Sequence, residues 1–450
     1  MANFQNLTPI NGFDFADLNN ARQNNYAWSM SELDDFIYVG TGRNIVYNII
    51  KTIQPQTQIP ALIKPDPVVN LAEIWRYKKD GSLPWQRVYQ APPDSGIVGF
   101  RYMINFKPFK GSPALYAAGF GDRTKIVKST NGVNWYILPD TVLQGNSSRA
   151  MVVHKGKLYV ATVDELSENP TPFLYSSEDP EFYPWQPVID PTAPGFKPHK
   201  NPQGGIYNMA VFNNRIYVST ITENGVQVWR TNKEEPRLND WTLVVDNGFG
   251  NPANRYSLAM GVFKNHLYVS GTKDLPLSWF IPMGCDIVRI DKNDNWRVIV
   301  GGNPLISFIP PKAVEAQKGK NANSAQNEAS VQNEPDVQNV PKVEDAEKLR
   351  SISGIGSGFN NPFNVYAWQI QEYKGRLFVS TFDDSSNMEV ILTTLLANKV
   401  ALEQLIGPII TRLLIEIYES VVEILRIIRY PMGFDLYVSE DGINFRSVLM

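Results

Sequence analysis

The sequence predicts an all-β fold, a β-propeller of six four-stranded blades. Two observations carry this prediction. First, a short turn followed by alternating aromatic and β-branched residues, as in NRIYVSTI at 214–221, occurs six times in the 450 residues. Second, each copy is preceded by one apolar strand and followed by two more. Four strands in every repeat, arranged radially, are typical of propellers.

Period-2 alternation between turn residues predicts each strand. The first strands are expected at 24–30, 100–106, 148–153, 206–212, 255–263 and 364–370, and the second strands at 35–42, 113–121, 156–163, 214–221, 265–272 and 375–382. The third strands are expected at 72–77, 124–130, 171–177, 226–231, 285–290 and 434–439, and the fourth at 85–89, 135–138, 185–189, 241–245, 296–300 and 445–449. The chain ends with the sixth unit, so either six blades close directly or a truncated seventh is missing.

The turn between the third and fourth strands has its own pattern. It reads STNGVNW at Ser129 to Trp135 and SEDGINF at Ser439 to Phe445. Asn or Asp followed by Gly suits a tight hairpin with positive φ. These turns resemble the Asp-box of sialidase-like propellers, and the whole pattern is similar to uncharacterised bacterial propeller proteins. The resemblance implies the fold, and it implies no specific activity because the box occurs in enzymes and binding proteins alike.

Composition excludes several classes of function. The formal net charge is −3, so no basic surface for nucleic acid is expected. The single cysteine, Cys285, allows no internal disulfide, and three histidines make a histidine-rich metal site or a Ser-His-Asp triad improbable. We expect no metal and no cofactor. The N-terminus lacks a secretory pattern and no apolar run is long enough to span a bilayer, so a cytoplasmic or non-classically released protein is expected.

Long insertions gather on one face of the predicted single domain, 1–450. Turns between first and second strands are all short, whereas the long segments follow second strands or join blades. Insertions on one face often mark a binding face, although a face that merely tolerates length is the alternative. The largest insertions are 42–71 in the first blade, 301–363 between the fifth and sixth, and 388–429 in the sixth.

Two of these insertions have a distinctive composition. Residues 312–350 lack aromatic residues and are rich in Asn, Gln, Glu, Lys and Ala, which is typical of a disordered linker. Residues 388–429 carry apolar residues at helical spacing, interrupted at Gly407-Pro408, and predict a helical hairpin. That hairpin would pack onto the propeller or into an oligomer, or would bind a partner.

Polar and aromatic residues at the starts of first strands and the ends of second strands are expected to form a ring at the mouth of the central channel. Three of them, Arg101, Arg149 and Arg255, occupy equivalent positions. The resemblance to sialidases implies that three arginines clamp a carboxylate beside a Tyr–Glu nucleophile and an Asp acid–base. The predicted ligand-binding residues are Tyr26, Arg101, Tyr102, Arg149, Tyr207, Arg255, Tyr256, Tyr366, Asp122, Asp164, Glu223 and Asp383.

Two functions remain open on the sequence. The first, which we favour, is a non-enzymatic module that binds a glycan, another ligand or a protein partner on the insert-bearing face. The second is a carbohydrate-active hydrolase or lyase that acts at the channel mouth. A wet channel lined by mutually satisfied polar groups is the plain structural alternative to both.

Overall fold

The computed structural model describes residues 5–53, 56–60, 63–65, 70–140, 142–165, 167–274, 278, 281–302 and 347–449. The chain is mostly β and divides into two compact units. The first comprises Met1–Ile221, Trp229–Thr242 and Ser385–Pro431, and the second comprises Thr222–Val228, Leu243–Asp384 and Met432–Met450. Whether the whole chain acts as one domain stays a prediction.

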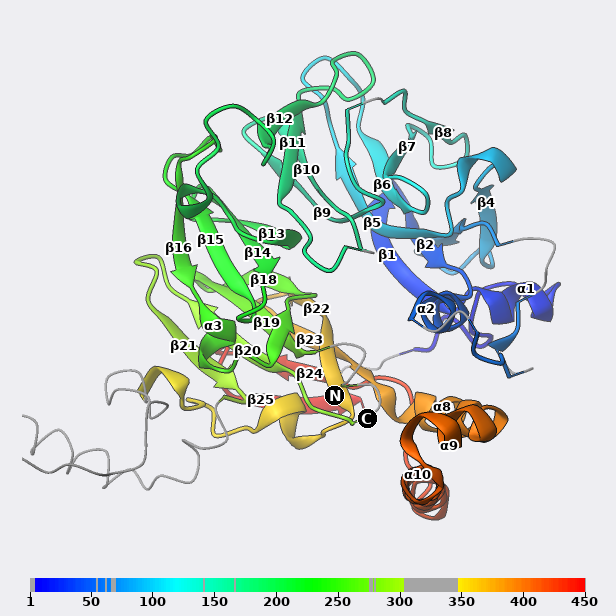
Figure 1. The fold of residues 1–450 in the computed structure, drawn as a ribbon. Helices are drawn as coiled ribbons and strands as arrows, with labels where there is room; N and C mark the ends of the chain where they lie inside the picture. The colour runs from blue at the N-terminus through cyan, green and yellow to red at the C-terminus, as the bar shows by residue number, and fades with distance from the viewer. Residues whose placement is uncertain are drawn as a thin grey trace, which may run out of the picture. The chain divides into compact units, whose positions relative to one another are not determined.

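The strands follow the predicted repeats closely (Figure 1). The first three repeats hold β1 (Tyr26–Leu33), β2 (Phe36–Gly42), β3 (Glu73–Lys78), β4 (Gln86–Gln90), β5 (Gly99–Phe106), β6 (Ala114–Phe120), β7 (Lys125–Ser129), β8 (Tyr136–Ile137), β9 (Ser147–His154), β10 (Lys157–Val163), β11 (Phe173–Ser177) and β12 (Gln186–Ile189). The last three hold β13 (Gly205–Phe212), β14 (Arg215–Ile221), β15 (Gln227–Thr231), β16 (Trp241–Val245), β17 (Asn254–Tyr256), β18 (Met260–Phe263), β19 (His266–Lys273), β20 (Asp286–Ile290), β21 (Trp296–Val300), β22 (Asn364–Tyr373), β23 (Arg376–Asp383), β24 (Leu436–Ser439) and β25 (Phe445–Leu449).

Neighbouring strands of each repeat pair antiparallel in chain order, as in β9-β10-β11-β12 and β22-β23-β24-β25. The prediction of a mostly β chain built from four-stranded antiparallel sheets is therefore confirmed, whereas one closed six-bladed propeller stays a prediction. One expected strand is wrong in detail, because 255–263 is split into β17 and β18. Between them the Ala259 N–H donates to the Ser270 hydroxyl (3.1 Å) and not to a backbone carbonyl of β19.

Helices occupy the insertions and the connections. They are α1 (Leu18–Gln23), α2 (Ile45–Ile53), α3 (Asn247–Gly250), α8 (Met388–Ala397), α9 (Lys399–Ile406) and α10 (Pro408–Ile427), with short 3₁₀ turns η2 (Pro93–Ser95), η3 (Pro198–Lys200), η4 (Ser357–Asn360) and η5 (Asp384–Asn387). α8 to α10 lie where helix was predicted, and α10 packs on α8 and α9 through one face. The other face of α10 leaves Leu413, Ile417 and Ile424 exposed.

The predicted disordered segment 312–350 lies largely outside the described residues. Its last residues, 347–350, are described and contact the fifth repeat. Leu349 is buried, and Arg350 forms a bridge with Gly302. The Ile352 N–H then donates to the Val298 carbonyl (3.0 Å), so this stretch is anchored along β21. Composition could not show this because the anchoring contacts come from a distant strand.

The core lies between the faces of successive sheets. Ala118 and Ile126 of the second repeat share one buried cluster with Met151 and Val160 of the third. Small and branched side chains that alternate along each strand place one apolar face against the next sheet. The same pattern in the second compact unit joins residues such as Tyr268 and Val379.

The two glycine turns fold identically. Asn131 Oδ1 accepts from the Val133 and Asn134 N–H groups (2.9 and 2.8 Å), and the Ser129 hydroxyl accepts from Gly132 (2.9 Å). The matching bonds in the sixth repeat, from Ile443, Asn444 and Gly442 to Asp441 and Ser439, are each 2.8 Å long. A side-chain acceptor thus closes each turn, as Asx motifs do.

A buried polar junction recurs in the first, fifth and sixth repeats. Each begins with a Gly-Phe pair whose phenylalanine, Phe13, Phe249 or Phe359, has a φ of 71°, 65° or 62°. An asparagine at the start of the first strand donates to the glycine carbonyl and to a buried carboxylate that opens the third strand. These asparagine–carboxylate pairs are Asn24–Glu73 (2.8 Å), Asn254–Asp286 (2.9 Å) and Asn364–Asp435 (2.7 Å).

A charged residue at the C-terminal end of the second strand, or directly after that end, completes each junction. Arg43 lies 3.6 Å from Glu73, and Lys273 lies 2.6 Å from Asp286, both as buried ion pairs. In the sixth repeat Asp383 takes this place and accepts from Asn361 Nδ2 at 3.2 Å. In the first and fifth repeats these ion pairs hold the chain that enters the repeat, because buried charges are stable only when paired and hydrogen-bonded.

Candidate functional site

A β-bulge occurs near the start of several first strands, at or close to positions where site residues were predicted. The register of β5 shifts between Phe100 and Tyr102, so Arg101 is the extra residue. The register shifts in the same way at Trp28 in β1, at Tyr207 in β13 and at Arg255 in β17. Bulges re-aim a side chain out of the alternating pattern and are frequent beside active sites. Sequence alternation cannot locate them.

Arg101 is held between aromatic rings in the first compact unit. Its guanidinium carbon lies 4.2 Å from the centre of the Trp28 ring and 4.6 Å from that of Phe120. The side chain is only 12% exposed, and its Nε makes no hydrogen bond with any described residue. Stacking on aromatic faces stabilises a guanidinium at low solvent exposure while leaving hydrogen-bond donors unsatisfied.

Arg149 forms a bidentate ion pair with Glu165, a residue of the loop that follows β10. The Nε and Nη2 groups donate to the two carboxylate oxygens at 2.6 and 2.8 Å. Arg101 Nη1 lies 3.5 Å from the same carboxylate, so two arginines share Glu165. The Arg149 guanidinium also lies over the Tyr207 ring at 4.7 Å. The Glu165 N–H donates to Asn146 Oδ1 (3.0 Å), which positions the loop. Arg101, Arg149, Glu165 and Tyr207 are called the arginine cluster below.

Burial and the charges of the cluster shift the pKa of Arg101 and the pKa of Glu165. Burial lowers the pKa of Arg101 to about 10, and the neighbouring Arg149 charge adds to this effect. Burial alone would raise the pKa of Glu165, but the charges of Arg101 and Arg149 outweigh it and lower the pKa to about 2. Glu165 is therefore ionised throughout the neutral range, and a carboxylate of such low basicity is poorly matched to proton transfer.

The other predicted residues of the first unit surround the cluster only in part. Tyr26 lies beside Trp28, with ring centres 5.9 Å apart. Tyr102 packs against the core, and burial raises its pKa. Asp122 and Asp164 are exposed. Neither Trp28 nor Phe120 was among the predicted site residues, although both lie near predicted positions in the strand pattern.

The remaining predicted residues belong to the second compact unit. Arg255 Nη1 donates to the Glu223 carbonyl at 3.0 Å, so Glu223 takes part through its backbone. Tyr256 is half-buried at the end of β17, and Tyr366 stacks on Phe382 at 4.7 Å. Asp383 lies in the polar junction described above. Convergence of all three arginines on one point stays a prediction.

No group of three or more His, Cys, Asp or Glu side chains suited to a metal ion is found among the described residues. Of the helices in the described ranges, none has the length and apolar character that crossing a bilayer requires.

Comparisons with known proteins give distant structural similarity alone. No protein-family model and no curated protein matches the chain. Similar solved structures include a GH43 β-1,3-galactosidase with galactodeoxynojirimycin (10% identity, covering 80% of this chain and 85% of that chain, TM-score 0.35). They also include a family 117 glycoside hydrolase from Zobellia galactanivorans (12%, 59% and 84%, 0.33) and a nidogen/laminin complex (12%, 60% and 76%, 0.35). Similarity at this level carries no conclusion about what this chain binds or catalyses.

Proposed function

We propose that the protein is a non-enzymatic binding module that recognises a carboxylate-bearing ligand, with acidic glycans as the first class to test, at the arginine cluster. The observation that carries the proposal is that Arg101 and Arg149 share the single Glu165 carboxylate. Guanidinium groups suit bidentate recognition of carboxylates, and aromatic rings beside them suit the apolar faces of a ligand.

Glu165 itself supports the choice of ligand charge. Its carboxylate accepts two hydrogen bonds from Arg149 while it contacts Arg101, so the cluster accommodates a carboxylate in this geometry. Glu165 belongs to the loop 164–170, one of the insertions on the predicted binding face. A ligand carboxylate would therefore compete with Glu165 for Arg101 and Arg149.

Proton chemistry supports binding over catalysis at this cluster. A general acid or base needs a pKa near the working pH, and Glu165 has a pKa of about 2. A tyrosine nucleophile needs an adjacent base, whereas burial raises the pKa of Tyr102. The alternative of a carbohydrate-active enzyme would require other groups than these.

Calorimetric titration with sialyllactose and with lactose tests the proposal, because the two ligands differ in one carboxylate-bearing sugar. We expect sialyllactose to bind, lactose to bind weakly or not at all, and Arg149→Ala to lower the affinity for sialyllactose at least about tenfold. Arg376→Ala removes an exposed arginine paired with Glu440 (3.4 Å) and serves as the matched control.

Mass spectrometry of the same mixtures separates the two functions. An intact ligand agrees with a binding module. Cleavage that is lost in Arg149→Ala would replace the proposal with the enzyme, and equal affinity for both ligands would remove the role of the arginines.

A further inference from the structure

The aromatic residue that opens the fourth strand packs on a ring or in the core in five of the six repeats. Trp85 lies 4.6 Å from Phe13, Trp135 lies 6.3 Å from Tyr38, and Phe445 lies 5.4 Å from Phe359. Trp185 and Trp241 are buried. Phe13 and Phe359 are the phenylalanines of the Gly-Phe pairs, so this ring contact belongs to the junction of the first and sixth repeats.

The fifth repeat breaks this pattern. It has the equivalent pair, Phe249 and Trp296, yet no ring contact joins them among the described residues, and Trp296 is only half-buried. Trp296 instead lines a cavity of about 570 Å³. Trp296 thus lacks the aromatic partner that Trp85, Trp135 and Phe445 have, and Asn247 and Gly250, which flank Phe249 in the chain, line the same cavity.

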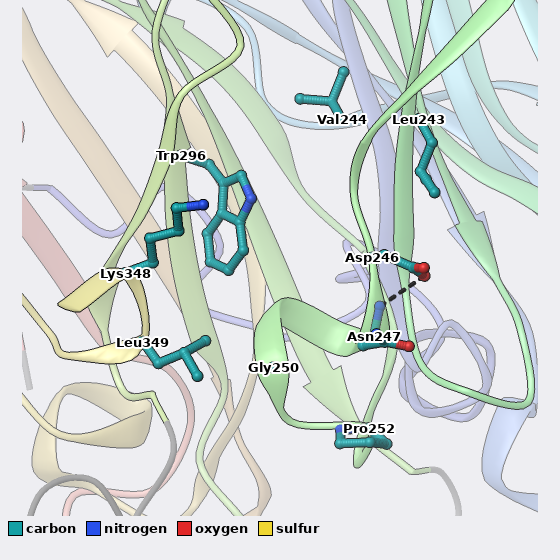
Figure 2. Close-up of a pocket in the computed structure, with 9 residues that line it drawn as sticks. All are labelled: Leu243, Val244, Asp246, Asn247, Gly250, Pro252, Trp296, Lys348 and Leu349. Carbon is teal, nitrogen blue, oxygen red and sulfur yellow. Dashed lines mark hydrogen bonds between the residues drawn. The ribbon is translucent and has the colours of Figure 1, made fainter. Parts of the chain in front are cut away.

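Figure 2 shows the walls of this cavity. Trp296, Lys348 and Leu349 form one side, and Leu243, Asp246 and Asn247 face them. Val244, Gly250 and Pro252 complete the lining, which is mostly apolar. A volume of this size fits a small organic molecule, and an apolar lining with few polar groups is usual for such sites.

The polar groups of the cavity define the charge that it would accept. Asp246 is occupied, because its Oδ1 accepts from the Asn247 N–H (2.8 Å) and from Gln227 Nε2 (2.9 Å). Lys348 is exposed, and its ammonium lies on the Trp296 side of the cavity. Buried Leu349 and the Arg350–Gly302 bridge fix the backbone beside it.

We infer that this cavity is a binding site for a small aromatic carboxylate, separate from the arginine cluster. The ligand ring takes the place of the missing aromatic partner of Trp296, in an offset or edge-on contact. The ligand carboxylate pairs with Lys348, and the leucines and Pro252 cover the ring edges. The Trp296 ring, the leucines and Pro252 favour an indole or phenyl ring over a sugar, which presents less apolar surface to them.

Saturation-transfer NMR and calorimetry with indole-3-acetate and indole-3-acetamide test this inference, since the two probes differ only in charge. Indole-3-acetate is expected to bind more tightly than the amide. Lys348→Gln should lower acetate affinity about fivefold and abolish the preference, because one exposed ion pair is worth about 1 kcal/mol at most. Lys374→Gln, which removes a lysine 5.1 Å from the Tyr373 ring, is the matched control and should change nothing.

Trp296→Ala should abolish the saturation-transfer signal of both indole probes, and Trp296→Phe should retain part of that signal. Absence of binding by wild-type protein, unchanged binding in Trp296→Ala, or an acetate preference that survives Lys348→Gln would overturn the inference. Lys348 is exposed, so its variant reports on the site even where a tryptophan variant fails to fold. Arg149→Ala should bind indole-3-acetate normally, which keeps this site distinct from the proposed function.

Discussion

Single residues close the turns and aim the side chains of this protein. Gly132 has a φ of 70°, and a Cβ placed there would lie 1.8 Å from the Tyr38 hydroxyl of the preceding repeat. Gly442 repeats the arrangement, with a φ of 78° and 1.9 Å to the Tyr268 hydroxyl. These glycines are needed for two reasons, the left-handed backbone and the close approach of a tyrosine. The Asn-Gly and Asp-Gly pairs in the sequence predicted the left-handed backbone. The close approach of a tyrosine appears only in the packing of the structure.

Gly132→Ala should destabilise the protein more than Gly156→Ala does. Both glycines have a positive φ (70° and 76°), but a Cβ at Gly156 meets nothing within 4 Å. The left-handed conformation costs about 1–2 kcal/mol in each variant, and the contact with Tyr38 adds about 1–3 kcal/mol in Gly132→Ala alone. Urea unfolding measures both, and equal losses would show that Tyr38 moves aside without cost.

The ion pairs of Glu165 should make the free energy of unfolding decrease as the pH becomes acidic. Its pKa is about 2 in the folded protein against an ordinary 4.5. Because the folded pKa is the lower one, the ion pairs contribute fully above the unfolded pKa and are lost as the pH falls toward 2. The contribution at neutral pH is on the order of 3 kcal/mol.

Urea unfolding of wild type and of Glu165→Gln between neutral and acid pH measures the contribution of these ion pairs to the free energy of unfolding. The two proteins should differ most above about pH 5 and converge near pH 2. A difference that does not depend on pH would mean that Glu165 acts through packing alone.

At the scale of elements, the strands were predicted well and the junctions between them were not. Alternating residues located each strand pair, since one face of every strand is buried. The same reasoning did not predict the ion pairs Arg43–Glu73 and Lys273–Asp286, which the structure buries. The bulges at Arg101 and Tyr207 were also invisible to a strict period of two. Pairing across distant strands decides both features.

Asp286→Asn should be strongly destabilising. The substitution leaves the buried Lys273 ammonium without its carboxylate, which lies 2.6 Å away in the wild type. Removing one partner of a buried pair costs about 3–5 kcal/mol. Thermal and urea unfolding measure the loss, and Glu440→Gln, in the exposed pair with Arg376, should cost under about 1 kcal/mol. Similar losses in the two variants would mean that the junction is open to water.

At the scale of the whole molecule, the repeats form the scaffold and the insertions distinguish one repeat from another. α8, α9 and α10 pack on one another, and Arg426 of α10 pairs with Glu389 of α8 at 2.7 Å. β23 and β24, which flank the insertion, are paired directly, from Leu377 with Ser439 to Ser380 with Leu436. Apolar residues at helical spacing predicted this insertion.

Replacing 388–429 with a short Gly-Ser linker should leave the strands folded. The β23–β24 pairing does not depend on the helices, so we expect cooperative thermal unfolding and a β-type circular dichroism spectrum. Light scattering of the same samples tests the alternative that 388–429 packs into an oligomer, since Leu413, Ile417 and Ile424 of α10 are exposed. Loss of cooperative unfolding would show that the insertion is part of the scaffold.

We propose above that the arginine cluster binds a ligand carboxylate, and Glu165 is the internal competitor of that carboxylate. Calorimetric titration of sialyllactose into wild type and Glu165→Gln at neutral pH tests it most directly. Glu181→Gln, which breaks the Lys128–Glu181 pair (2.6 Å) in another turn, is the control. We predict that Glu165→Gln binds about tenfold more tightly than wild type, because the internal competitor is gone. Equal or weaker binding in Glu165→Gln, or no binding by either protein, would contradict the claim.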